Sequence, residues 1–389
     1  MKVSPLSGSD PVRIGVLGCA DIARRRTLPA FAADPGSRVV AVASRDGARA
    51  REVADRYGCA AVTGYDRLLA DPEVEAVYVP LPVALHAPWI ERALLAGKHV
   101  LGEKPLTGDA GSTRRLFELA AARGLVLAEN FMFPHHRLHQ RVRDLLADGA
   151  IGELRSFTGE FAIPAPPPGD IRYDADLGGG ALLDIAVHPL LAARSFLGPA
   201  LTVCGARLRR HPVHGVDTGG AVLLAAPDGV TAQVVFGMEH AYRSAYELWG
   251  SAGRIRVERA YAPPADHRPV IHLERPDSTE DLVLQPDDQY LAAVRAFSHA
   301  VRHEPRAADG ARVPDRPRDR HGPRAERGLR ERHQERALAV ARLVAEVRAA
   351  DEAASSAAQH PVPSWEIREG PYELRSHRQT ALRAHREIP

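Results

Sequence analysis

Lys104 is the residue whose position points most directly to chemistry. It follows the apolar run HVLG, inside the sequence Glu103-Lys104-Pro105. A lysine at the carboxyl end of a parallel strand points into the crevice where open α/β sheets bind their ligands. Its ammonium group could stabilise the charge that develops on a carbonyl oxygen, or relay a proton. We therefore predict that Lys104 is a catalytic residue, and Pro105 opens the option of a cis peptide bond beside it.

Asp184 and His188 form the second candidate pair. They follow the glycine run Gly178 to Gly180 and stand four residues apart in the sequence LLDIAVHP. On a helix that spacing puts both side chains on one face. A carboxylate beside an imidazole can orient it and raise its basicity, which suits general acid–base catalysis near neutral pH. The alternative is a structural ion pair on a solvated face, but the apolar and glycine-rich flanks favour a crevice.

A glycine-rich turn near the N-terminus predicts a dinucleotide site. It follows the pattern G-x-G-x-x-G/A with alanine at the second glycine position, and its residues are Gly18, Cys19, Ala20, Asp21, Ile22 and Ala23. The pattern serves a tight turn, a close approach of the backbone to a pyrophosphate, and a helix N-terminus whose free N–H groups face the anion. The segment stands between the apolar run VRIGVL and an amphipathic stretch, a context that argues against an incidental glycine turn.

The end of the next apolar run, RVVAVAS, indicates which dinucleotide is bound. NAD enzymes usually carry an acidic residue there for the ribose hydroxyls, whereas this chain has Ser44 and Arg45. A hydroxyl and a guanidinium suit a 2′-phosphate, because arginine offers paired planar donors to phosphate oxygens. Asp46 leaves a dual preference open, and we favour NADP(H) over NAD(H). Tyr65 is either a wall for the adenine or a core tyrosine.

Short apolar runs alternate with stretches of helical length over residues 12–130. The runs are VRIGVLG, RVVAVAS, AVYVPLP, KHVLGEKP and LVLAEN, and the helix candidates are Ile22–Ala33, Ala48–Tyr57, Ala84–Ala96 and Ser112–Ala122. This alternation, with nearly continuous apolar strands, argues for a parallel sheet covered on both faces. We predict an α/β fold whose N-terminal part, residues 1–135, is a doubly wound Rossmann domain.

Longer strand candidates follow Ile151, with turn signals between them. They are Glu153–Ile163, Leu201–His211, Thr218–Ala226, Val230–Glu239 and Tyr246–Val257, with one helix candidate at Gly180–Phe196. Such spacing is typical of antiparallel strands. We predict a second, α+β domain with a mostly antiparallel open sheet over residues 136–302, serving substrate binding and oligomerisation.

The C-terminal part has a different composition. Residues 303–336 are dominated by arginine, proline, aspartate and histidine, and dense charge with low hydrophobicity favours disorder. Residues 337–350 regain helical periodicity, and we expect that helix to pack back onto the body. Residues 351–389 show no clear pattern and stay unassigned.

Composition excludes several classes of function. The chain has 389 residues, 45% of them apolar, and a formal net charge of +2, which does not suggest a nucleic-acid partner. No apolar run reaches the ~20 residues that a membrane span needs, and the N-terminus shows no apolar signal core. The scattered cysteines, Cys19, Cys59 and Cys204, show no metal-ligand spacing. We expect a cytoplasmic protein without a metal, a nucleic-acid partner or a membrane partner.

At these motifs the sequence resembles the glucose–fructose oxidoreductase/inositol dehydrogenase/rhizopine catabolism (Gfo/Idh/MocA) superfamily. The matching pieces are RIGVLGCADIA, PLPVALHAPWIERALLAGKHVLGEKPLT, AENFMF and GGGALLDIAVHP. Within it the chain looks closest to the sugar-nucleotide C-3 ketoreductases of deoxysugar biosynthesis, through GCADIA, ENFMFPHH, GDIRYDADLGGGALLD and TAQVVFGMEHAYRSAYE.

The resemblance implies an NADPH-dependent oxidoreductase that reduces the C-3 ketone of a dTDP-linked keto-deoxysugar. It implies a homo-oligomer, a dimer or tetramer, built through the sheet of the second domain. Lys104 takes the place of the family lysine, and His188 that of the acid–base residue. The family also suggests cofactor contacts from Leu81, His86, Glu103 and Arg172, and substrate contacts from Tyr173 and Tyr242.

Position 188 keeps an alternative open. Ketoreductases of this subgroup usually carry tyrosine where this chain has His188, whereas inositol dehydrogenase-like relatives carry the Asp-x-x-x-His arrangement. The alternative enzyme is therefore an NAD(P)-dependent dehydrogenase of a free sugar, inositol or dihydrodiol. A non-enzymatic alternative is a nucleotide-sensing regulatory protein, which would not need the lysine and histidine pair.

Overall fold

The computed structural model describes residues 10–303 and 328–359. The N-terminal sheet contains β1 (Val12–Leu17), β2 (Ser37–Ser44), β3 (Ala60–Thr63), β4 (Ala76–Val79), β5 (His99–Glu103) and β6 (Leu127–Asn130). These strands are parallel in the order β3-β2-β1-β4-β5-β6. The strand order reverses between β1 and β4, so the carboxyl ends of these two strands border the crevice where such sheets bind dinucleotides.

Helices connect the strands of this sheet. A π-helical segment at Ala23–Thr27 leads into α1 (Leu28–Ala33), and α2 (Gly47–Tyr57), α3 (Tyr65–Leu69), α4 (Val83–Leu95) and α5 (Ala110–Ala122) follow. Asp46 caps α2, because its carboxylate accepts hydrogen bonds from the N–H groups of Ala48 and Arg49. β4 and β5 are buried along their whole length, which explains the apolar runs AVYV in β4 and VLG in β5.

The second sheet is large and open. Its strands are β7 (Leu154–Ala162), β8 (Thr202–Arg210), β9 (Asp217–Ala225), β10 (Thr231–Gly237), β11 (Arg243–Gly250), β12 (Arg254–Glu258), β13 (Val270–Arg275) and β14 (Ser278–Val283). Their order is β14-β13-β12-β11-β7-β10-β9-β8, and only β7 and β10 pair in parallel. The predicted α/β class, with a Rossmann domain and a mostly antiparallel second sheet, is confirmed.

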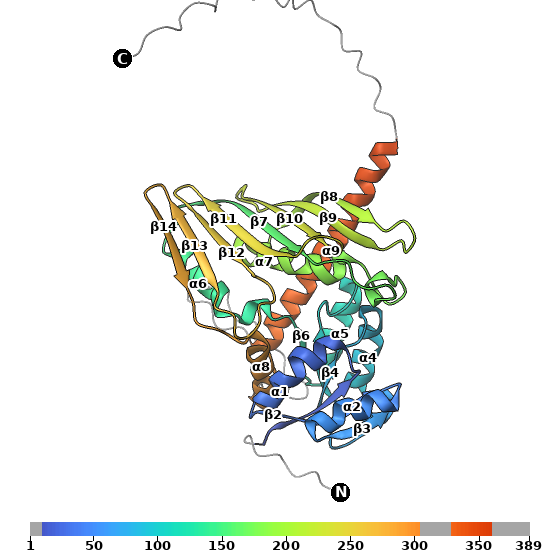
Figure 1. Ribbon diagram of the computed structural model, residues 1–389. Coiled ribbons are helices and arrows are strands. Elements are labelled where there is room, and N and C mark those ends of the chain that lie inside the picture. Colours follow the sequence, from blue (N-terminus) through green and yellow to red (C-terminus); the bar gives the residue numbers. More distant parts are fainter. Residues whose placement is uncertain (1–9, 304–327, 360–389) are drawn as a thin grey trace, which may run out of the picture.

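Helices line one face of this sheet, while the other faces outward (Figure 1). Side chains of α6 (Arg137–Ala147) and α7 (Val187–Leu197) share the core of this domain with its strands. A π-helical segment, Leu182–Ala186, leads into α7. No described helix is long and apolar enough to cross a membrane.

The C-terminal helices correct two predicted boundaries. The helix α8 (Gln289–His303) packs Tyr290, Val294 and Phe297 into the Rossmann core, although its sequence lies inside the predicted second domain. The helix α9 begins at Leu329 and ends at Gln359, so it is longer than the predicted 337–350. Residues 304–327, the rest of the predicted disordered segment, and the tail from residue 360 lie outside the described residues.

Buried polar contacts explain why α9 begins inside a charge-rich sequence. The Nδ1 atom of His333 accepts a hydrogen bond from the N–H of Glu129, at 3.0 Å. Further along, Asp351 accepts a hydrogen bond from the N–H of Leu208, so α9 also covers the edge strand β8. The periodicity of apolar residues does not reveal such polar contacts, so it could not predict where α9 begins.

Three strands and the helices α3 and α6 were not predicted from the sequence, and one predicted strand runs through a predicted turn. β3 is only four residues long and largely exposed, and β13 and β14 form a hairpin at the sheet edge. The predicted strand Tyr246–Val257 is two strands, because the Ser251-Ala252-Gly253 turn breaks it.

Candidate active site

Lys104 lies at the boundary between the two domains. It directly follows β5, and the Lys104–Pro105 peptide bond is cis. Its Nζ atom donates two hydrogen bonds of 2.7 Å, one to Oδ1 and one to the main-chain oxygen of Asp184. Asp184 belongs to the π-helical segment before α7. The contact therefore joins the crevice edge of the Rossmann sheet to the helix that covers the second sheet.

Asp184 holds two cations at once. Its Oδ2 atom accepts a hydrogen bond from Nε of Arg172 at 2.6 Å, and Arg172 also pairs with Asp170. Burial opposes ionisation of Asp184, but the charges of Lys104 and Arg172 outweigh it and hold its pKa well below the usual range. Asp184 is therefore ionised at neutral pH and fixes the position of the Lys104 ammonium.

His188 lies in an apolar box next to this ion pair. The rings of Phe131 and Phe161 have centroids 5.1 Å from the imidazole, and that of Tyr261 lies 6.1 Å away. Burial, followed by the charge of Lys104, holds the pKa of His188 well below its ordinary value. The imidazole is therefore neutral at physiological pH.

The predicted pairing of Asp184 with His188 is not what the structure contains. Between these two described residues there is no hydrogen bond, and Nδ1 of His188 is buried without a partner. The carboxylate oxygens of Asp184 contact Lys104 and Arg172 instead. Two full cations attract a carboxylate more strongly than a neutral imidazole does, so the helical spacing alone gave the wrong partner.

Glu103 points into the Rossmann core. Its Oε1 atom accepts hydrogen bonds from the hydroxyl of Tyr78 at 2.5 Å and from the amide of Asn130 at 2.6 Å. The Tyr78 hydroxyl also lies 3.0 Å from that of Thr27. Burial raises the pKa of Glu103. This buried network anchors the strand end before Lys104.

Sequence reasoning missed Tyr78, Thr27 and Asn130. Tyr78 and Asn130 stand inside apolar runs that read as plain buried strands. A signal was nevertheless present, since buried polar groups in such runs need partners, and Glu103 ends β5, the strand that lies between those of Tyr78 and Asn130.

The glycine-rich turn follows β1 at the crevice edge. Gly18 has φ of 117°, and a Cβ atom there would lie 3.0 Å from the side chain of Leu81. Only glycine fits this conformation and space without strain. The turn brings backbone N–H groups to the start of the next helical segment, where a pyrophosphate would bind. The residues present therefore fit a dinucleotide.

The ribose end of the crevice is basic. The Ser44 hydroxyl accepts a hydrogen bond from the N–H of Asp46 at 3.1 Å. The Asp46 carboxylate caps α2, so it is already engaged. Arg45 is exposed, and its charge opposes the burial that raises the pKa of Tyr65. An engaged carboxylate and an exposed guanidinium at the end of β2 fit a 2′-phosphate better than free ribose hydroxyls.

His86 holds two loops of the crevice together. Its Nε2 atom lies 2.7 Å from the oxygen of Leu81, and Nδ1 lies 3.0 Å from the oxygen of Pro105. Burial lowers the pKa of His86. The imidazole thus links the loop beside Gly18 to the loop that carries Lys104.

The two tyrosines assigned to the substrate lie in different surroundings. Tyr173 neighbours Arg172, and its hydroxyl donates to Glu239 at 3.3 Å. Gly179 allows this loop to fold closely, because a Cβ atom there would lie 2.5 Å from the oxygen of Arg172. Tyr242 is half exposed, and none of the described contacts joins it to Lys104 or Asp184.

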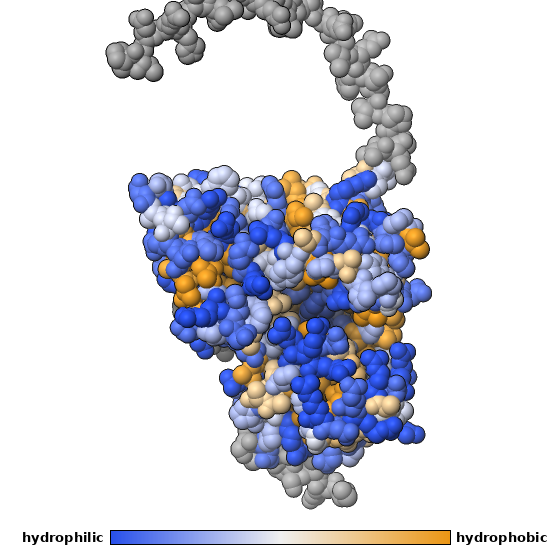
Figure 2. Space-filling view, viewed as in Figure 1, coloured by the Kyte–Doolittle hydropathy of each residue, from blue (hydrophilic) through white to orange (hydrophobic). Residues whose placement is uncertain are grey.

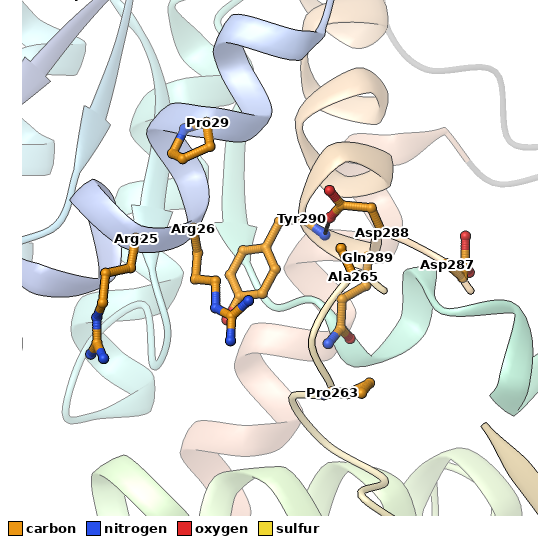
Figure 3. A pocket seen from close by; sticks show the side chains of 9 residues that line it. All are labelled: Arg25, Arg26, Pro29, Pro263, Ala265, Asp287, Asp288, Gln289 and Tyr290. Atoms are coloured by element: carbon orange, nitrogen blue, oxygen red, sulfur yellow. Dashed lines mark hydrogen bonds between the residues drawn. The ribbon is translucent and has the colours of Figure 1, made fainter. Parts of the chain in front are cut away.

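The surface is hollowed between the two domains on the face shown in Figure 2. A separate cavity of about 150 Å³ lies between the segment after the glycine-rich turn and the start of α8. Figure 3 shows Arg26 beside the ring of Tyr290 there, with the guanidinium carbon 5.9 Å from the ring centroid. Lys104, Asp184 and His188 do not line this cavity.

Comparison with known proteins agrees with this geometry. Residues 12–131 match the oxidoreductase family with an NAD-binding Rossmann fold, and residues 139–256 match the GFO/IDH/MocA C-terminal domain. The chain is 59% identical over 301 residues to the dTDP-3,4-didehydro-2,6-dideoxy-alpha-D-glucose 3-reductase of Streptomyces violaceoruber, covering 77% of this chain and 87% of that protein.

A second reductase of the same name, from Actinomadura kijaniata, is 54% identical over 295 residues, covering 76% of this chain and 89% of that protein. The crystal structure of a 3-ketoreductase from Actinomadura kijaniata with NADP and TDP-benzene has a TM-score of 0.79 and 49% identity, covering 87% of this chain and 98% of that one. Both domains match models of one family, and the relatives above are more than half identical to this chain over most of its length. The chain therefore belongs to the GFO/IDH/MocA oxidoreductase family.

Proposed function

We propose that the protein uses NADPH to reduce the C-3 ketone of a dTDP-linked keto-deoxysugar. The observation that carries this proposal is the Lys104 ammonium, held by Asp184 at the crevice edge that Gly18 also borders. Relatives that share more than half of their aligned residues with this chain reduce such a sugar. The neighbouring ketoreductase structure contains NADP.

The chain's own residues would bind and protonate the ketone oxygen. NADPH held along the crevice edge would supply a hydride for the carbonyl carbon. Lys104 would donate a hydrogen bond to the oxygen and then a proton, leaving a neutral amine that takes a proton back from water. The Asp184 carboxylate favours this return, because it stabilises the charged form of its partner. Both the C–H and the O–H bond of the product alcohol are then accounted for.

His188 would act as a neutral group in this scheme. Its low pKa disfavours the imidazolium form, so it is a poorer proton donor than Lys104. A neutral imidazole still donates one hydrogen bond and accepts one. We therefore assign His188 to orienting the sugar or relaying the proton, and Lys104 to donating it.

The cofactor would lie along the carboxyl edge of the Rossmann sheet. The turn from Gly18 to Ile22 would hold the pyrophosphate, and Ser44 and Arg45 the 2′-phosphate. Leu81, beside Gly18, would line the same edge. The dTDP-sugar would enter from the second domain, near Arg172 and Tyr173.

The outward face of the large sheet supports a homo-oligomer. Leu223, Val235 and Trp249 point to the same side, and each has more than two fifths of its surface exposed. Exposed apolar patches of this kind mark interaction surfaces. Val235→Arg should convert the oligomer to a monomer in sedimentation, whereas an unchanged mass would reject this interface.

The free thiols of Cys19, Cys59 and Cys204 fit a reducing cytoplasm.

The function is tested by NADPH oxidation with dTDP-3,4-didehydro-2,6-dideoxy-alpha-D-glucose, the sugar of the reductase relatives. Rapid turnover that Lys104→Ala abolishes, with NADPH binding intact, supports the proposal. Turnover of a free sugar or inositol without turnover of the dTDP-sugar would favour the polyol dehydrogenase. Binding of cofactor without any turnover would favour a sensing protein.

A further inference from the structure

A second cavity lies among α6, α7 and α9, and none of its lining residues belongs to the site described above. Its volume is about 210 Å³. The lining residues are Phe133, Pro134, Arg143, Leu191, Arg194, Ser195, Arg332, Glu335 and Arg336. Sites for drug-sized ligands begin at roughly 300 Å³, so this cavity suits a smaller molecule.

The lining carries much more positive than negative charge. Four of its residues are arginines, and the single carboxylate is that of Glu335, which pairs with Arg194 at 2.8 Å. The Nε atoms of Arg194 and Arg336 are buried without a hydrogen-bond partner among the described residues. Arg336 is 9% exposed, and its Nε atom lies 3.7 Å from the Glu129 carboxylate. Arg143, which also lines the cavity, donates one described side-chain hydrogen bond, from its guanidinium to Gln140 at 3.0 Å, so other donors of that guanidinium remain for a ligand.

The cations around the cavity disfavour one another. Burial lowers the pKa of Arg336, the charge of Glu129 and its hydrogen bond oppose this effect, and the charges of Arg332 and Arg194 add a smaller lowering. Burial, Arg336 and Arg332 together lower the pKa of His135 to about 4. A bound anion would relieve this repulsion. The apolar side chains of Phe133 and Leu191 would keep water from screening the interaction.

We propose that this cavity, the arginine pocket, binds a small oxyanion such as a phosphate or carboxylate group. Guanidinium groups present paired planar donors that match the oxygens of such groups. The pocket is distinct from the crevice at Gly18 and Lys104, so its ligand is neither the cofactor nor the sugar. This goes beyond the proposed reductase function and does not depend on it.

The test is titration of the NADP-loaded protein with inorganic phosphate by calorimetry, at constant ionic strength. Loading with NADP occupies the phosphate sites of the cofactor crevice. Arg194→Gln and Arg143→Gln should each weaken phosphate binding about tenfold or more, because each removes a charged donor. Glu335→Gln should strengthen binding, because it removes the competing carboxylate. Arg141→Gln, an exposed change on α6 outside the pocket, is the matched control.

Equal affinity in the wild type and in all these variants would overturn the proposal, as would absence of saturable binding to the wild type. The unfolding midpoint and NADPH affinity of each variant identify any that fails to fold. The gain expected for Glu335→Gln keeps the test decisive, because a damaged fold does not increase affinity.

Discussion

The Nζ atom of Lys104 lies 2.7 Å from Oδ1 of Asp184, across the boundary between the two domains. The lysine side chain is 13% exposed and the aspartate side chain 30% exposed. This pair fixes the position of the ammonium that we propose contacts the substrate carbonyl.

Lys104→Ala should lower kcat about 10²–10⁴-fold, the range of a positioned proton donor. NADPH should still bind, because the cofactor turn at Gly18 is untouched. Single-turnover kinetics and a fluorescence titration of NADPH check both parts. Full turnover in Lys104→Ala would remove this residue from the mechanism.

Asp184→Asn should make the free energy of unfolding depend less on pH in the acid range. The folded state lowers the pKa of Asp184, so the unfolded state binds more protons as pH falls below the ordinary value of about 3.9. The stabilisation by this carboxylate is therefore complete above that pH and is lost as pH falls towards the folded-state value. Urea unfolding of the wild type and Asp184→Asn across this range should show the difference in unfolding free energy shrinking with acid. A constant difference would contradict this.

His188→Tyr should keep turnover, while His188→Phe should reduce it. Both rings fit an aromatic box, but only tyrosine keeps a hydroxyl that can hydrogen-bond to the sugar or relay a proton. The wild type should also lose stability below about pH 6.5, because the unfolded chain protonates His188 and the folded protein keeps it neutral. Urea unfolding of both variants should lack this component, whereas an identical pH dependence in wild type and variants would argue against a buried neutral imidazole.

Arg45→Ala should weaken NADPH binding roughly tenfold or more and leave NADH binding nearly unchanged. A hydrogen bond to a charged group contributes about 1.5–3 kcal/mol, and only NADPH carries the 2′-phosphate. Comparison of the two dissociation constants checks this. Arg51→Ala, an exposed change on α2, serves as the control. Equal losses of affinity for NADPH and NADH would show that Arg45 does not contact the 2′-phosphate.

Local sequence determined the Rossmann fold, the glycine-rich turn after β1 and the family. Buried parallel strands need continuous apolar residues, and the turn at Gly18 needs a residue without Cβ, so both leave marks in adjacent positions. Apart from β3 and α3, which were not predicted, the strands and helices in residues 12–130 followed the predicted segments closely. The position of Lys104 was also predictable from the sequence, because the carboxyl ends of parallel strands border the crevice where such sheets bind ligands.

Only the tertiary structure decided which side chains pair. Arg172 and Lys104 reach Asp184 from separate segments, and no spacing along one helix encodes a competition between partners for a carboxylate. The same reason explains α8 and α9: Tyr290 completes the Rossmann core and His333 contacts Glu129 across long sequence separations. The charge state of His188 depends on burial by Phe131, Phe161 and Tyr261, which come together only in the folded chain.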